Sequence, residues 1–367
     1  MHPTSVQQPV RPPPKADSTN TVEVCGHGQV SIDQSDAAIF RLVGALTQGA
    51  RTRWLSALQN SDDLRARVAG LLLEGKVTGG DSLRPAQEQT RNEVVQLAAG
   101  SRDPAVYALA LAMCSTAAVT DAESACRELS LQQWAQMDPD NAVPWLLLAG
   151  RARSRHDSAA EAEAFSHAAT AHTIDSYSDS VYTFAEPELP PDVTPLEQSY
   201  LATEVIGVEA AIGLPQYSAA SQHCSTIAMQ DSTVQQQCRS LAELLVTKGT
   251  NLLDLGLGKT IGARAGWSSA RVKELVLEQH ALMESIIQQG PSDNDKMWTC
   301  DAVIHANAYM AQRVRLGEIG AARDALERSG ETVVEMAQKY TEYTVTPSDV
   351  TFSRESSRIH RSPLSEW

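Results

Sequence analysis

Apolar residues recur at helical spacing over most of the chain. The clearest run follows Thr194-Pro195-Leu196-Glu197, with apolar side chains every three or four positions: Leu201, Val205, Val208 and Ile212. Proline suits the first turn of a helix because the N–H that it lacks is not needed there. The pattern predicts an amphipathic helix that ends near Gly213 and Pro215.

Similar spacing predicts further helices at about 36–48, 62–74, 86–99, 232–248, 270–289, 296–315 and 318–339. Two more helix starts come from capping boxes, Thr120-x-x-Glu123 and Ser158-x-x-Glu161, in which the hydroxyl and the carboxylate bond free backbone N–H groups. Few windows alternate with the two-residue period of a strand. We therefore expect an all-α protein of stacked antiparallel helical hairpins.

Three segments interrupt the helical pattern. Residues 1–32 begin with a Pro-rich, polar stretch that predicts a disordered tether, and residues 341–367 predict a flexible tail. Residues 174–193 are rich in serine and acid and predict a long linker loop between an N-terminal half, 33–173, and a C-terminal half, 194–340. The alternative is that 174–193 forms an internal binding loop.

The most specific pattern lies in the middle of the chain. Pro139 precedes Trp145 by six residues, and key side chains then follow at fixed offsets: Trp145, Leu148, Ala149, Phe165 and Ala168. Trp, a Leu three positions on, a small residue next, and a later Phe and Ala are the spacing of the tetratricopeptide repeat. The segment at about 103–170 resembles that repeat, although Ala152 and Glu161 depart from it.

A second copy of the pattern precedes the first. Asp103-Pro104 lies 35 residues before Asp138-Pro139, close to the family period of roughly 34 residues. A weaker echo occupies 297–330, where Gly317 would make the turn between two helices. By analogy with the fold, the resemblance implies stacked hairpins that present a groove to a protein or peptide partner. The matching residues are packing positions and leave the binding surface unidentified.

Charge excludes one class of partner. The 367 residues carry a formal net charge of −15, from 45 acidic and 30 basic side chains, without a basic stripe. Sequence-independent binding of nucleic acid needs clustered Lys and Arg, so no nucleic-acid partner is expected. No run approaches the roughly 20 apolar residues that span a bilayer, which predicts no transmembrane segment.

One motif suggests an enzyme. Gly256, Gly258, Lys259 and Thr260 resemble part of the phosphate-binding loop of helicase-like ATPases, in which glycine backbone cradles phosphate and Thr holds Mg²⁺. The full pattern requires Gly where this chain has Leu253, and the preceding 241–249 is typical of a helix rather than a buried strand. We therefore favour a helical or turn segment here, and keep a nucleotide-binding enzyme as the alternative function.

Four of the six cysteines fall in two pairs, each bracketing the turn between predicted helices. Cys114 with Cys126 and Cys224 with Cys238 are candidate disulfides, and the alternative is that all four are small buried side chains. Cys25 and Cys300 remain, and would pair only if the N-terminal segment folded back across the array. Disulfides favour an exported or periplasmic protein, whereas the lack of a signal-peptide pattern in 1–15 favours the cytoplasm.

Other chemistry is not indicated. The nine histidines form no His-x-x-x-His or His-Glu-x-x-His pattern, so we expect no metal, no cofactor and no catalytic residue. The function predicted from the sequence is a non-enzymatic scaffold that presents a groove to a protein or peptide. A structural component of an envelope assembly is a further alternative.

Overall fold

The computed structural model describes residues 20–32, 36–75, 83–116, 125–212, 217–289 and 296–345. Helices make up most of these residues, and the sheet of the described residues is a single two-stranded hairpin. The all-α prediction is therefore confirmed. The strands are β1 (Asn20–Val24) and β2 (Gly28–Ile32).

The helices follow in chain order. The first group is α1 (Asp36–Asn60), α2 (Leu64–Glu74), α3 (Leu83–Ala99), α4 (Pro104–Thr116), α5 (Leu131–Met137), α6 (Ala142–Ser154), α7 (Ser158–Thr170) and α8 (Val181–Ala185). The second is α9 (Pro195–Ile212), α10 (Ser218–His223), α11 (Ser232–Lys248), α12 (Leu252–Arg264), α13 (Ser269–Gln289), α14 (Cys300–Ser329) and α15 (Val333–Val345). Short 3-10 turns lie at Ala125–Glu128, Glu186–Glu188 and Ala228–Gln230.

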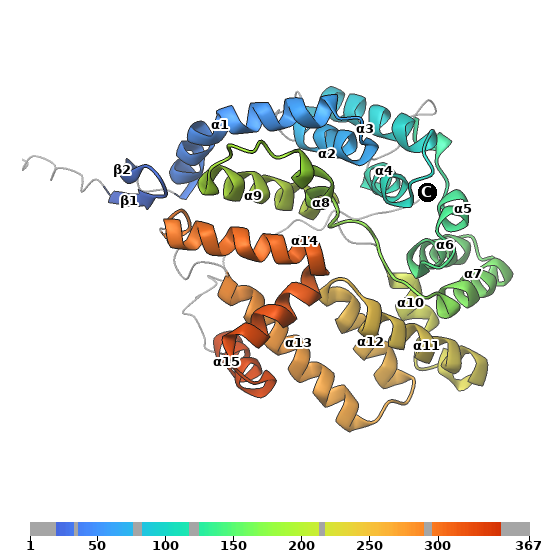
Figure 1. The fold of residues 1–367 in the computed structure, drawn as a ribbon. Helices are drawn as coiled ribbons and strands as arrows, with labels where there is room; N and C mark the ends of the chain where they lie inside the picture. Colours follow the sequence, from blue (N-terminus) through green and yellow to red (C-terminus); the bar gives the residue numbers. More distant parts are fainter. Residues whose placement is uncertain are drawn as a thin grey trace, which may run out of the picture.

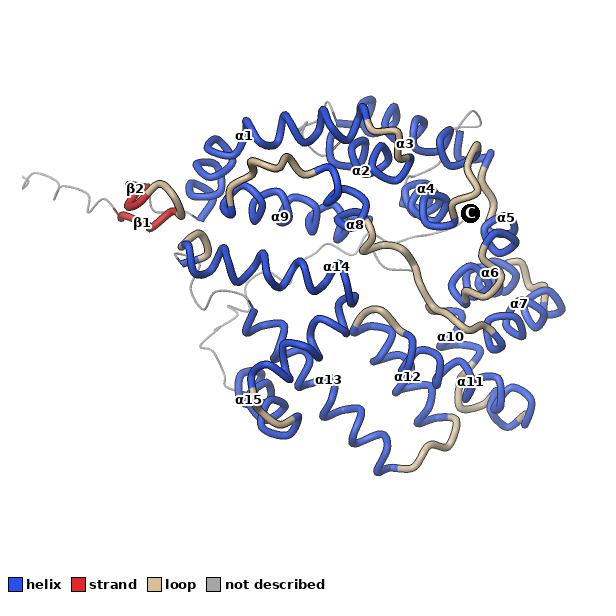
Figure 2. Tube along the Cα trace, viewed as in Figure 1, coloured by secondary structure: helices blue, strands red, loops and turns tan. Residues whose placement is uncertain are grey.

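The helices form a curved array around an inner layer (Figure 1). Helices α1 to α7 run along the outside of the arc, and α10 to α13 continue it. Helix α9 packs against α1 and α14, and α8 packs against α2, on the inner side. An extended loop crosses from α7 to α8 along the inside of the arc (Figure 2).

This crossing loop corrects the expected linker at 174–193. Ile174, Val181 and Ala185 are almost fully buried, and Trp54 Nε1 donates a hydrogen bond of 2.9 Å to the carbonyl of Ala185. One hydrophobic core includes residues from both sides of the loop, and α7 packs on α11. The segment therefore belongs to the folded interior and does not separate two halves.

The N-terminal prediction is wrong for residues 20–32, while residues 1–19 lie outside the described part of the chain. Residues 20–32 form the hairpin. Gly26 in its turn and Gly28 at the start of β2 both have positive φ, a backbone region that favours glycine. Val22 and Val24 alternate onto one face and are buried in a small core with Trp298. The predicted flexible tail at 341–367 is wrong for residues 341–345, which belong to α15.

Capping side chains explain where α7 and α9 start, although one cap lies one residue before its predicted position. The predicted helix start at Thr194-Pro195 is confirmed, and Thr194 and Glu197 form a capping box there: Thr194 Oγ1 accepts from the N–H of Glu197, and the Glu197 carboxylate accepts from the N–H of Thr194. At the start of α7 the cap is Asp157, whose Oδ1 accepts from the N–H of Ala160 at 3.0 Å. The predicted cap at Thr120 lies outside the described residues.

The 35-residue spacing does not mark equivalent positions. Asp103 caps α4, with Pro104 as the first helical residue, whereas Asp138 ends α5 and Pro139 lies in the turn before α6 begins at Ala142. The structure is helical but does not confirm a tetratricopeptide-like arrangement. At the third echo, Gly317 (φ 72°) breaks α14 into two helical arms, which agrees with the predicted turn.

All six cysteines form disulfides. Cys114–Cys126 and Cys224–Cys238 are the two predicted pairs, and Cys25–Cys300 joins the hairpin to the start of α14. Three bridges suggest folding in an oxidising environment. In the part of the chain that the structure describes, no helix is both long enough and apolar enough to cross a bilayer.

Candidate functional site

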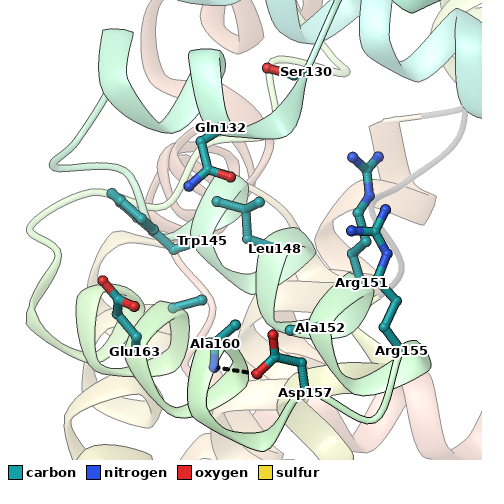
Figure 3. A pocket seen from close by; sticks show the side chains of 11 residues that line it. Ser130, Gln132, Trp145, Leu148, Arg151, Ala152, Arg155, Asp157, Ala160 and Glu163 are labelled. Carbon is teal, nitrogen blue, oxygen red and sulfur yellow. Dashed lines mark hydrogen bonds between the residues drawn. The ribbon is translucent and has the colours of Figure 1, made fainter.

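An open groove of about 220 Å³ lies where α5, α6 and α7 meet (Figure 3). Its lining comes from the start of α5, from one face of α6 and from the first turns of α7. The lining residues are Ser130, Gln132, Trp145, Leu148, Arg151, Ala152, Arg155, Asp157, Ala160, Glu163 and Ala164. We call this the α5–α7 groove.

The α5–α7 groove has an apolar floor. Trp145 and Leu148 are each half-buried, and the indole of Trp145 stacks on the His167 ring at 4.1 Å between centroids. The indole Nε1 donates to the carbonyl of Pro139 at 3.0 Å. The ring stacking and the hydrogen bond together hold the indole in place, so the apolar floor exists without rearrangement of this side chain.

The five residues expected to pack the repeat differ in burial. Ala149, Phe165 and Ala168 lie in the core with at most 1% exposure. Trp145 and Leu148 are partly buried: they pack against the same core and also line the groove. The sequence pattern gave no distinction between the two sets, because both follow the same helical spacing.

Two arginines stand at one end of the α5–α7 groove. Arg151 lies in the last turn of α6, and Arg155 is the residue directly after the helix. Both are exposed and form no ion pair among the described residues. Figure 3 shows both guanidinium groups on the same side, while Glu163 lies at the opposite end. Both cations also sit near the C-terminus of α6, where the helix dipole favours positive charge.

A partly buried polar contact behind the groove joins α6 and α7 to α10. Glu161 on α7 binds Arg153 on α6 and lies 3.3 Å from Nδ1 of His223 on α10. The His223 ring stacks on Phe165 with 3.7 Å between ring centroids. This contact joins three helices, so α6 and α7 are held in a defined position relative to the following part of the array.

The opposite end of α6 is fixed by Asn141, which is fully buried. Its Nδ2 donates to Asp138 Oδ2 at 2.8 Å and to the carbonyl of Asp175 at 2.7 Å. Its Oδ1 accepts from the N–H groups of Val143 and Asp175. The side chain thus caps α6 and ties the crossing loop to it.

Carboxyl groups gather around the crossing loop in the interior. Burial raises the pKa of Glu209 to about 7, although Arg313 and the N–H of Tyr182 both favour its charged form. Burial also raises the pKa of Asp254 to about 7 and that of Asp175 to about 6. Glu209 and Asp254 are buried, Asp175 is partly exposed, and none of the three lines the α5–α7 groove.

The phosphate-loop residues do not form a loop. Gly256, Gly258, Lys259 and Thr260 lie inside α12, where backbone N–H groups bond within the helix and are not free to bind phosphate. Lys259 Nζ donates to Gln279 Oε1 at 2.7 Å. A Cβ at Gly258 would stand 2.8 Å from Leu245 Cβ, so this glycine permits close packing of α12 on α11. The geometry does not support the nucleotide alternative.

Metal chemistry is also not indicated. Among the described residues, no group of three or more His, Cys, Asp or Glu side chains is arranged to hold a metal ion. Comparison with known proteins gives no match: no family model, no curated protein and no solved structure is similar to the chain. The α5–α7 groove is the feature from which a function can be argued.

Proposed function

We propose that the protein is a non-enzymatic interaction scaffold, with tetratricopeptide-like hairpins in its middle, that holds a segment of a partner protein in the α5–α7 groove. The observation that carries the proposal is the pre-formed apolar floor, where Trp145 and Leu148 remain half-exposed on a surface shared by three helices. Stacked helix pairs use such curved surfaces for recognition, and the step from fold to function is an analogy.

The size of the α5–α7 groove favours a peptide over a small molecule. Small-molecule sites typically enclose roughly 300–1,000 Å³ and bury most of the ligand. A volume of about 220 Å³ that is open to solvent accommodates one or two side chains of a longer segment. The remainder of such a segment would extend along α6 and α7.

We further propose that the protein works in an exported or periplasmic compartment. Six paired cysteines support this, because structural disulfides are rare where thiols are kept reduced. The test is a count of free thiols in denatured, non-reduced protein from its native compartment. Zero free thiols is expected, and six would contradict the proposal.

The scaffold proposal is tested with a phage library of random heptapeptides selected on the oxidised, full-length protein. We expect enriched peptides to bind wild type and to lose about tenfold or more in affinity with Leu148→Glu, which places a charge on the apolar floor. The matched control is Ile227→Glu, because Ile227 is 81% exposed and lies outside the α5–α7 groove. Peptides that bind both variants equally, or no enriched peptide at all, would refute the proposal.

A further inference from the structure

We infer that the α5–α7 groove selects an acidic peptide segment, in which one apolar side chain contacts Trp145 and Leu148 and a nearby carboxylate binds Arg151 and Arg155. This inference rests on the proposed scaffold function and adds the chemical class of the ligand. Its basis is a pair of cations without an anion, next to an apolar floor.

Several arginines of the described residues hold carboxylates, as Arg65 holds Asp103 and Arg323 holds Glu278. Others contact only neutral groups, as Arg264 contacts the carbonyl of Ser221 and Arg315 contacts Gln312. On the same helix, Arg153 holds Glu161. Arg151 and Arg155 have no such partner in the described part of the chain, although both line the α5–α7 groove.

Their spacing suits one carboxylate. Arg155 lies four residues after Arg151, directly past the end of α6, and both line the same groove, so these two like charges repel each other when no anion is bound. In Figure 3 both arginine side chains lie on the same side of the groove. A guanidinium presents a planar fork of N–H donors that matches the two oxygens of a carboxylate. A bound carboxylate would relieve the repulsion and accept from both forks.

The acidic residues of the groove do not satisfy the pair. Asp157 already caps α7 through the N–H of Ala160, and Glu163 lies at the far end in Figure 3. The Asp157 carboxylate keeps its charge, but the two arginines outweigh it, so the groove is net positive at the α6 C-terminus and negative near Glu163. This polarity also defines a direction, because the acidic residue of the bound segment must lie at the Arg151 end.

The overall charge of −15 opposes an acidic ligand at long range. At physiological ionic strength charges are largely screened beyond about 8 Å, so the two adjacent cations dominate once the segment is bound. The contact itself is exposed, and higher salt should weaken it.

The test selects heptapeptides on the wild-type protein and then compares the affinity of these peptides for three proteins. The first is wild type, the second is Arg151→Glu with Arg155→Glu, and the third is Arg41→Glu with Arg315→Glu. The third is a matched control, since Arg41 and Arg315 are exposed, lie on α1 and α14, and their reversal changes the net charge equally. Thermal melting checks that each variant folds.

We expect Asp or Glu to be enriched next to an apolar residue in the selected peptides. Affinity for the best peptide should fall about tenfold or more in the groove variant and less than about twofold in the control. Replacing the acidic residue of the peptide by the corresponding amide should lower the affinity of the peptide for wild type by about the same factor.

Two results would contradict the acidic-ligand inference, and only the second of them would also contradict the scaffold function. Peptides that depend on Leu148 but show no acid preference, and that bind the arginine variant unchanged, refute the acidic ligand and leave the scaffold function standing. No Leu148-dependent peptide at all refutes both.

Discussion

Nη2 of Arg313 lies 3.2 Å from Oε2 of Glu209 and joins α14 to α9 in the interior of the array. The Glu209 side chain is 6% exposed, and its other oxygen accepts from the N–H of Tyr182 at the start of α8. The ion pair therefore connects an inner helix, the crossing loop and the C-terminal array.

The first prediction concerns this pair. Arg313→Met should destabilise the fold by about 3 kcal/mol at pH 8, because it leaves the buried Glu209 carboxylate without its cation. Urea unfolding measures the loss, which should be smaller at pH 5, where Glu209 is protonated. The double variant Arg313→Met with Glu209→Gln should recover part of the stability. A double variant as unstable as the single one would show that Arg313 acts through packing instead.

The second prediction is a dependence of stability on pH. Burial raises the folded-state pKa of Glu209 and Asp254 to about 7 and that of Asp175 to about 6, so the native state binds more protons than the unfolded state between about pH 4 and 7. Their contribution to stability is complete below pH 4 and is lost as the pH rises through 7. The melting temperature should therefore be higher near pH 5 than at pH 8.

The matched variant for the pH profile is Asp254→Asn. Its amide oxygen can still accept from the N–H of Thr250, which now bonds Asp254 Oδ2 at 3.1 Å, but it no longer titrates. The fall in melting temperature between pH 5 and 8 should shrink in this variant. An unchanged profile would show that Asp254 does not contribute to it.

Much of the helical layout was predictable because it depends on local signals. The pattern at 232–248 gave the bounds of α11, and Thr194 with Glu197 gave the start of α9. The hairpin at 20–32 was not predicted, although Val22 and Val24 alternate. Two alternating residues indicate a buried strand face only if the residue that covers them, here Trp298, is also known. That contact spans nearly the whole chain.

The α5–α7 groove was less predictable for a related reason. Trp145 and Phe165 both fit the repeat pattern, yet Phe165 is buried and Trp145 opens on the groove. Which side of a helix remains uncovered depends on its neighbours in space, here α5 and α7. The pairing of Cys25 with Cys300 likewise required the hairpin to fold onto α14.

The third prediction concerns that bridge. Cys25→Ser with Cys300→Ser should lower the free energy of unfolding by about 4 kcal/mol, because Cys25–Cys300 closes the longest loop of the three disulfides, with a sequence separation of 275. Guanidinium unfolding with Trp fluorescence measures this, since Trp298 is only 1% exposed beneath the hairpin. Removal of Cys114–Cys126, which closes 12 residues, should cost less. Equal losses would contradict the loop-length argument.

The fourth prediction concerns Asn141. Asn141→Ala should destabilise the fold by about 3 kcal/mol, because it leaves buried donors and acceptors of Asp175 and Val143 without partners. The crossing loop should also open, and limited proteolysis between 174 and 180 measures this. Asn60→Ala is the control, since that amide is exposed and bonds only within its own helix turn. Equal cleavage in both variants would rule out the proposed anchoring.

The fifth prediction separates helix packing from phosphate binding at α12. Gly258→Ala should cost about 2 kcal/mol, because its Cβ would stand 2.8 Å from both Leu245 Cβ and Val246 Cγ2 and 3.0 Å from the carbonyl of Ala242. Gly256→Ala should be close to neutral, since the nearest atom, 3.0 Å away, is the end of the flexible Gln279 side chain and alanine favours the helix. Urea unfolding measures both. A phosphate loop would instead need both glycines for ligand contact, so calorimetric ATP binding that either substitution abolished, with folding intact, would contradict the packing role.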